Sequence, residues 1–123
     1  MVSLGRMAIA TINMPQMVNF YRKVLNANLS PMSVGDFTFY QGRMGNVSVT
    51  LAPNEMLGIQ SENSRHQLSF LVPNLETALS VAIRAGATQM EEISEEADER
   101  YCGILDPDGN SIELVERVYE AAY

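Results

Sequence analysis

The sequence predicts an α+β protein built from two consecutive β-α-β-β-β modules. A chain of 123 residues is long enough for one compact domain with its own core. Two stretches with the apolar period of an amphipathic helix lie about 60 residues apart, and each follows one strand-like run and precedes three more. We therefore expect a single domain, residues 1–123, with a first module at about 5–52, a connector at 53–65 and a second module at about 66–118.

The first module begins with a strand-like run at residues 6–13, which a helix at 14–28 follows. Pro15 fits the first helical turn, where its missing N–H group removes no hydrogen bond. Asn26 can adopt the left-handed conformation that ends a helix. Three strands are expected next, at 29–35, 37–42 and 46–52, and a turn at 43–46 joins the last two.

The second module repeats this order after the connector, which is rich in turn formers. Its helix is expected at 74–86, with Asn74 as the N-cap and Gly86 as the left-handed stop. The acidic stretch 94–100 is expected to be a solvated loop. Strands are expected at 66–72, 87–93, 101–106 and 111–118, and the Asp-Pro-Asp-Gly-Asn run at 106–110 is a tight turn between the last two.

Composition and charge exclude several classes of function. Eight Lys and Arg residues against fifteen Asp and Glu give a formal net charge of -7, with a pI near 4.5. Such a chain repels polyanions, so we expect neither nucleic acid nor membrane as a partner. No apolar run approaches the length of a membrane span or a signal-peptide core. Cys102 has no partner for an internal disulfide, so we expect a cytoplasmic location and a buried, unreactive thiol.

Three sequence stretches carry a resemblance to a known family. They are "NFYRKVL" at 19–25, "VPNLETALSVAIRAGA" at 72–87 and "DPDGNSIELVE" at 106–116. In this order and separation, the chain resembles the vicinal oxygen chelate superfamily, which includes glyoxalase I, extradiol dioxygenases, fosfomycin-resistance enzymes and bleomycin-binding proteins. The resemblance implies that the modules form a curved mixed sheet or open barrel around a cavity, within a homodimer. It also implies a divalent metal, held by side chains from four strands, in those members that are enzymes.

The resemblance assigns the metal-ligand positions to Arg6, Ser48 or Thr50, Gln67 and Glu113. An arginine cannot ligate a cation, because it is permanently charged and has no lone pair to give. A hydroxyl group replaces a carboxylate poorly. Only Glu113 therefore keeps a standard ligand, and we expect no tight catalytic metal centre. Gln67, Glu113 and one hydroxyl would form a weak oxygen-rich site, better suited to Mg or Ca than to Zn, Ni or Fe.

The one histidine, His66, lies next to the third ligand position. Because strand side chains alternate between faces, the more apolar even-numbered residues of 66–72 are expected beneath the helix, and Gln67 is expected to face the cavity. A β-bulge would reverse this assignment. In that alternative, a metal such as Zn, Ni, Fe or Mg would be held by Glu113, Gln67 and His66.

The same alternation directs Glu113 into the cavity, where an unpaired carboxylate needs a counter-charge or a proton. Arg6 occupies another ligand position of the same site. We therefore expect the Arg6 guanidinium to stand where the metal would stand and to pair with Glu113. In the alternative, Arg6 lies in solvent and Glu113 is hydrated.

The sequence thus favours a metal-free protein that binds a small molecule, aromatic or cationic, without a cofactor, as in sequestration or resistance. Whether it is an enzyme stays open. One alternative is a metal-dependent lyase, thiol transferase or dioxygenase of the same superfamily, and another is a non-catalytic dimeric interaction module. A binding cavity asks for a largely apolar hollow with a few polar groups. The residues expected to line it are Arg6, Thr50, Gln67, Glu113, Phe39 and Tyr101.

Overall fold

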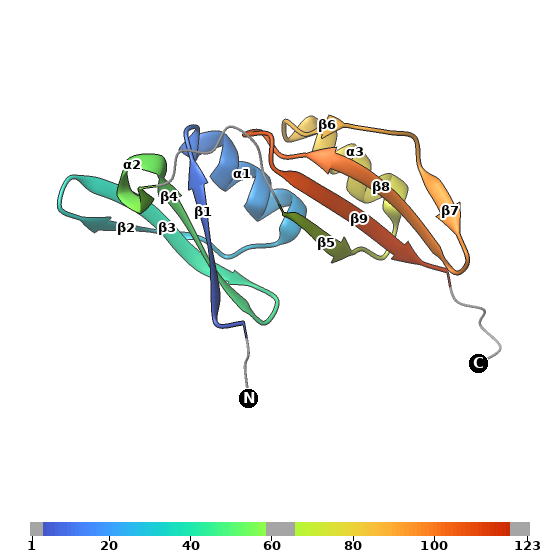
Figure 1. The fold of residues 1–123 in the computed structure, drawn as a ribbon, viewed down its shortest axis with the longest axis horizontal. Coiled ribbons are helices and arrows are strands. Elements are labelled where there is room, and N and C mark those ends of the chain that lie inside the picture. The colour runs from blue at the N-terminus through green and yellow to red at the C-terminus, as the bar shows by residue number, and fades with distance from the viewer. Residues whose placement is uncertain (1–3, 59–65, 119–123) are drawn as a thin grey trace. The chain divides into compact units, whose positions relative to one another are not determined.

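The structure, a computed structural model, describes residues 4–58 and 66–118. These residues form two compact units, which we call module one (4–58) and module two (66–118). Each module has one mixed β-sheet and one long helix (Figure 1). The predicted α+β class and the two-module order are confirmed.

Module one contains a four-stranded sheet in the order β1-β4-β3-β2. Strands β1 and β4 run parallel, whereas β4, β3 and β2 pair antiparallel. The chain connects β1 to β4 through the helix and then β2 and β3, so the helix packs against the sheet. The elements are β1 (Arg6–Thr11), α1 (Met14–Leu25), β2 (Ser30–Val34), β3 (Phe37–Met44), β4 (Val47–Pro53) and the one-turn helix α2 (Asn54–Leu57).

Module two has the same arrangement with one more strand. Its sheet has the order β5-β9-β8-β6, and the short strand β7 also pairs with β8. Strands β5 and β9 are parallel, and the remaining pairs are antiparallel. The elements are β5 (Gln67–Leu71), α3 (Leu75–Arg84), β6 (Thr88–Gln89), β7 (Ser94–Glu96), β8 (Glu99–Leu105) and β9 (Ser111–Arg117).

The helix ends follow the predicted signals. Pro15 lies in the first turn of α1, and Asn26 ends this helix in the left-handed conformation, with φ of 55°. Asn74 caps α3, since its side-chain oxygen accepts a hydrogen bond from the Thr77 amide at 2.9 Å. Gly86 follows with φ of +103°, a backbone conformation that favours glycine. These four predictions are confirmed.

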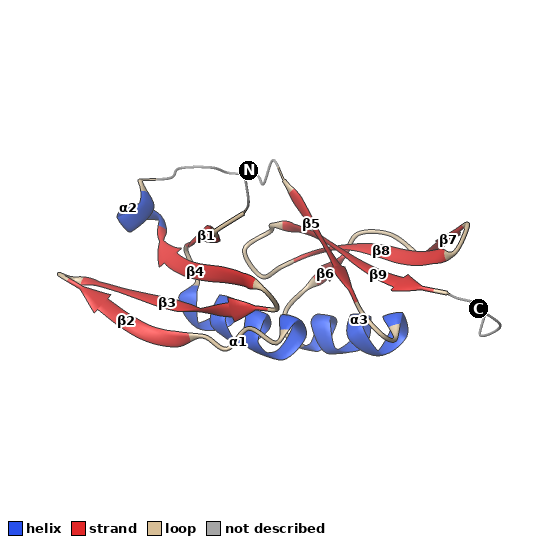
Figure 2. Cartoon of the chain, turned by 90° about the horizontal axis from the view of Figure 1, so that it is seen from below, coloured by secondary structure: helices blue, strands red, loops and turns tan. Residues whose placement is uncertain are grey.

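Each long helix packs against one face of the sheet in its own module (Figure 2). In module one, α1 buries Met17, Val18, Phe20 and Tyr21, and the strand side chains Val49 and Leu51 are fully buried. In module two, α3 buries three apolar side chains, and the fully buried strand residues are Cys102, Ile104, Ile112 and Leu114. We call the other side of each sheet its open face.

Two predictions about irregular segments are wrong. The acidic stretch 94–100 is not a loop but a β-hairpin, in which β7 and the start of β8 pair around a turn at Ala97 and Asp98. Arg100 forms ion pairs with acids on neighbouring elements, so the charges that favoured a solvated loop are partly neutralised.

The connector is also more regular than expected. Pro53 belongs to β4, and Asn54–Leu57 form one helical turn that ends at Gly58, with φ of 67°. The strand expected at 87–93 is limited to Thr88–Gln89. The remaining connector residues, 59–65, lie outside the described part of the chain, and the single-domain boundary stays a prediction.

Candidate functional site

The pairing register of the strands in module one shows which side chains face the helix and which belong to the open face of the sheet. Tyr40 contacts α1, because the Arg22 guanidinium lies 5.7 Å from the centre of its ring. Leu51 lies opposite Tyr40 on β4, so both face the helix. Since side chains alternate, Thr50 and its neighbours Gln41 and Ala8 belong to the open face.

One end of the open face of module one carries two positive charges. Arg6 on β1 and Arg43 on β3 lie in register on either side of Ser48, and both arginines are exposed. Arg43 donates a hydrogen bond to the Asn46 carbonyl at 2.8 Å. Two residues along β4, Thr50 is buried and accepts a hydrogen bond from the Gln41 amide at 3.3 Å.

The other end of this face is apolar. Phe39 is 7% exposed and lies opposite Met32 on the edge strand β2. Phe37 lies opposite Val34 in the same pair of strands. Three of these side chains are exposed, namely Met32 at 47%, Val34 at 58% and Phe37 at 37%. The open face of module one therefore combines a cationic end with an apolar one.

The open face of module two contains Glu113, as the alternation predicts. Ile112 and Leu114 are fully buried under α3, and Glu113 between them is half-buried. The Ser69 hydroxyl of β5 donates a hydrogen bond to Glu113 Oε1 at 2.9 Å. On the same face, the Gln67 amide donates to the Ser111 hydroxyl at 3.1 Å. The predicted direction of Gln67 and Glu113 relative to the helix agrees with this geometry.

Tyr101 adds an aromatic ring to this negatively charged face. It lies diagonally from Glu113 across the β8–β9 pair, and its phenol donates a hydrogen bond to Glu96 Oε2 at 3.1 Å. That hydrogen bond raises the pKa of Tyr101 above its ordinary value, and the negative charges of Glu96, Glu91 and Glu113 act in the same direction. The phenol therefore remains a protonated donor at neutral pH.

Gly103 has no side chain, which leaves space for the carboxylates of Glu91 and Glu113 beside it. It lies directly opposite Glu113, and its amide donates to Glu91 Oε1 at 3.3 Å. A Cβ atom at this position would lie 3.2 Å from the same oxygen. Three carboxylates, those of Glu91, Glu96 and Glu113, thus lie around the β8 segment that carries Tyr101.

The helix side of module two is also charged, but its charges are paired. Arg100 forms a two-point contact with Glu76 of α3 and lies 3.2 Å from Glu95 and 3.6 Å from Glu116. The hydrogen bond from Arg100 holds the pKa of Glu76 below its ordinary value. Glu116 also accepts the Leu75 amide at 2.6 Å, at the start of α3. This network ties the hairpin and α3 to the sheet.

Cys102 is fully buried on the same side, and burial raises the pKa of its thiol. A raised pKa reduces the thiolate fraction, which is the nucleophilic form. The expected buried, unreactive role of Cys102 agrees with this environment.

The donor set of the four assigned positions does not fit a transition metal. His66 precedes β5 and is exposed, and the positions in the strands are an arginine, a hydroxyl, an amide and one carboxylate. Among residues 4–58 and 66–118, no group of three His, Cys, Asp or Glu side chains is placed to hold a metal ion. Arg6 and Glu113 belong to different modules, and their pairing stays a prediction.

Several polar residues of the open faces were not among the predicted site residues. Arg43 was assigned to the turn expected at 43–46, whereas β3 extends to Met44. Gln41 was placed in the expected strand, where it shares a face with Phe39, but was not among the predicted site residues. Glu96 was assigned to a loop, and Glu91 to a strand. Ser69 was also not predicted, although alternation could have identified it. It lies two residues after Gln67 in the same strand and therefore shares its face.

Two β-α-β-β-β modules, each with a polar open face, define a protein of the vicinal oxygen chelate fold. The sequence comparison agrees, because residues 6–115 match the family model for a glyoxalase-like domain. The chain belongs to the glyoxalase-like domain family. No curated protein sequence matches it.

Solved structures with this fold cover nearly the whole chain. A glyoxalase/bleomycin resistance protein/dioxygenase family enzyme from Burkholderia phytofirmans PsJN is 20% identical, with a TM-score of 0.76 over 96% of this chain and 100% of that one. The fosfomycin resistance protein FosX from Listeria monocytogenes is 11% identical, with a TM-score of 0.77 over 98% and 94% of the two chains. A glyoxalase-related enzyme from Fulvimarina pelagi is 12% identical, with a TM-score of 0.76 over 95% and 89%. At these identities the likeness establishes the fold.

No helix within the described residues combines the length and the apolar character that crossing a membrane requires.

Proposed function

We propose that this protein binds a small organic cation with an aromatic or apolar body, without a metal cofactor, and sequesters it. The observation that carries the proposal is the open face of module two. There, the ring of Tyr101 lies among the carboxylates of Glu113, Glu96 and Glu91. A cation gains from both the negative charges and the face of an aromatic ring.

The carboxylate of Glu113 supports a binding role rather than a metal site. Its Oε1 atom accepts the Ser69 hydroxyl, which leaves the second oxygen for a ligand. Its neighbour Gln67 offers only an amide, and the face has no imidazole within β5, β8 or β9. Such donors orient a ligand by hydrogen bonds and bind a transition metal weakly.

The open face of module one offers a separate apolar surface for a ligand of this class. Phe39, Phe37 and Met32 lie together on its open face, and Thr50 adds a hydroxyl that is already oriented by Gln41. Solved structures described as glyoxalase/bleomycin resistance proteins share this fold, which is in line with a role in resistance. Resistance itself is part of the proposal.

The test is a titration with benzyltrimethylammonium, followed by amide NMR shifts. We expect saturable shifts at Tyr101, Gly103 and Glu113, and no comparable shifts with the neutral analogue benzyl alcohol. Glu113→Gln should weaken binding about fivefold, the factor that corresponds to roughly 1 kcal/mol for a partly exposed charge contact. Glu92→Gln, which removes an equal charge from an exposed residue without a hydrogen bond to this face, is the matched control.

Arg6 provides a second arm of the same experiment. If Arg6 pairs with Glu113, it competes with the ligand, and Arg6→Gln should raise the affinity for the cation. If Arg6 lies in solvent, the affinity should change no more than in the control. Equal binding of the cation and benzyl alcohol, or full affinity in Glu113→Gln, would overturn the proposal.

A metal-dependent lyase, thiol transferase or dioxygenase is the second candidate, because Gln67 and Glu113 share a face and the neighbours include enzymes. Metal analysis of protein purified without chelator decides between the two. Stoichiometric Zn, Ni or Fe that is lost in both His66→Ala and Glu113→Ala would replace our proposal with this one.

We further propose a homodimer in the cytoplasm. A dimeric module without a small ligand would show the dimer in sedimentation but no stabilisation in a thermal-shift screen of organic cations.

A further inference from the structure

A second binding surface lies on the helix side of module one. Strands in a sheet are spaced about 4.8 Å apart, and a helix with its side chains is about 10–12 Å wide. One helix therefore cannot cover four strands. The hollow beside α1, next to β3, has a volume of about 390 Å³. This is near the lower end of the roughly 300–1,000 Å³ typical of small-molecule pockets. It is lined by Met14, Pro15, Val18, Asn19, Arg22, Lys23 and Tyr40.

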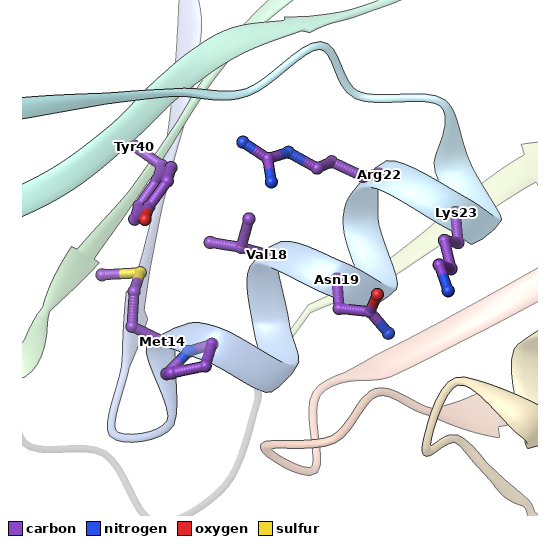
Figure 3. A pocket seen from close by; sticks show the side chains of 7 residues that line it. Met14, Val18, Asn19, Arg22, Lys23 and Tyr40 are labelled. Carbon is purple, nitrogen blue, oxygen red and sulfur yellow. The ribbon is translucent and has the colours of Figure 1, made fainter.

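The floor and one wall of this hollow are apolar. Figure 3 shows Met14 and Val18 on α1 directed towards the ring of Tyr40 from β3. Met14 and Val18 are one helical turn apart, so they form a continuous strip along the helix. Asn19 and Lys23 form the outer rim. An apolar body of limited size can therefore lie between the strip and the ring.

The end of the hollow is cationic. Arg22 follows Val18 by one turn, and its guanidinium points towards Tyr40, 5.7 Å from the ring centre (Figure 3). One of its five N–H groups is used, since Nη2 donates to the Leu29 carbonyl at 2.8 Å. This hydrogen bond and the ring contact fix the guanidinium in place, and the remaining donors are available.

These two cations also lack acidic partners. Within residues 4–58 and 66–118, neither Arg22 nor Lys23 forms an ion pair, although the chain has nearly twice as many acidic as basic residues. By contrast, Arg100 contacts three carboxylates. A pair of adjacent, uncompensated charges beside an apolar strip is complementary to an oxyanion that carries an apolar body.

We propose that the hollow between α1 and β3 binds a small amphipathic oxyanion, such as an aromatic carboxylate. Its carboxylate contacts the Arg22 guanidinium, and its ring lies between Val18 and Tyr40. The Lys23 side chain points away from Tyr40 and adds a positive charge at the rim (Figure 3). This surface is on the opposite side of the sheet from the open face, so the proposal is independent of the function proposed above. An acidic segment of a second copy of the chain is the competing occupant.

The test is a titration with benzoate, with benzyl alcohol and benzylamine as neutral and cationic analogues. Amide NMR shifts are expected at Val18, Arg22, Lys23 and Tyr40 with benzoate alone. Lys23→Gln is the main variant, because Lys23 makes no hydrogen bond that folding would lose. It should weaken benzoate binding about twofold, as expected for an exposed charge at the rim that does not touch the carboxylate.

Arg22→Gln should weaken binding more, about threefold to fivefold, as expected for one exposed charge contact. Unchanged amide shifts of β1 and β4 in module one would show that the variant is folded. Arg84→Gln, an exposed arginine at the end of α3, is the charge-matched control and should bind benzoate as the wild type does.

Three results would overturn the proposal. Benzyl alcohol binding as tightly as benzoate would show an apolar groove without anion recognition. A larger loss in Arg43→Gln than in Arg22→Gln would place the anion on the open face of module one. Shifts of the α1 amides that depend on protein concentration and persist without benzoate would show that a second copy occupies the hollow.

Discussion

Gly42 lies in β3 on the helix side of its sheet, and Gly103 lies in β8 on the open face of its sheet. Replacing each glycine by alanine tests the packing around it. Both glycines have an ordinary strand conformation, so only space decides the outcome. A Cβ atom at Gly42 would overlap the Asn28 carbonyl group, with 2.7 Å to its carbon and 2.8 Å to the side-chain oxygen. A Cβ atom at Gly103 would meet only the end of the Glu91 side chain, at 3.2 Å.

These distances give different magnitudes. Two hydrogen bonds hold Asn28 to Arg43. The Asn28 backbone amide donates to the Arg43 carbonyl at 3.2 Å, and the Arg43 backbone amide donates to Asn28 Oδ1 at 2.6 Å. Gly42→Ala must displace this backbone, which costs about 1–3 kcal/mol for overpacking and about 1 kcal/mol for a weakened hydrogen bond. The expected loss is therefore about 2–4 kcal/mol. The exposed Glu91 side chain can rotate away, and alanine restricts the unfolded chain, so Gly103→Ala should stay within about 1 kcal/mol of wild type.

Urea unfolding followed by circular dichroism measures the difference. With a slope of about 2 kcal/mol per M, Gly42→Ala should lower the midpoint by about 1–2 M, and Gly103→Ala by less than about 0.5 M. Gly5→Ala is the control, because a Cβ atom there has no neighbour within 4 Å. If Gly103→Ala lost as much stability as Gly42→Ala, the reasoning from backbone and side-chain contacts would be refuted.

Three further predictions concern polar groups of module two. Arg100 lowers the folded-state pKa of Glu76, so the stability it contributes is present above the ordinary value of 4.5 and is lost as pH falls through the folded-state value. Arg100→Gln should therefore flatten the fall in urea midpoint between pH 5 and 3, and an unchanged pH profile would contradict this. Asn74→Ala removes the N-cap of α3 and should lower the free energy of unfolding by about 1 kcal/mol, measured by thermal and urea unfolding. Because the hydrogen bond to Glu96 is the main cause of the raised pKa of Tyr101, Glu96→Gln should lower it, which a titration of ¹³C-labelled tyrosine would detect.

The sequence was sufficient for features that depend on nearby residues. The period of the apolar residues defined both long helices, and Asn26 and Asn74 marked a helix end and a helix start through their own backbone and side-chain chemistry. Alternation along a strand was enough to assign Gln67 and Glu113 to one face of their sheet. Each of these inferences requires only positions within one element.

Features that depend on distant residues were not predicted. The hairpin of β7 and β8 is stabilised by Arg100, whose partners include Glu76, more than twenty positions earlier in the chain. Glu91 approaches Gly103 because strand β6 stops pairing with β8 after Gln89. No local sequence signal marks the point where this pairing ends. The same holds for Arg43, whose place beside Ser48 depends on the register between β3 and β4.

The sequence by itself determined the order of the two long helices and the main strands, the residues that cap the helices, and the face on which Glu113 lies. Helix and strand periods act between neighbours along one chain segment. Only the tertiary structure decided which charges meet around Tyr101 and which remain unpaired beside α1. The physical reason is that electrostatic partners and pockets depend on distances across strands and between layers, and those distances are set only when the sheet pairs and the helix packs against it.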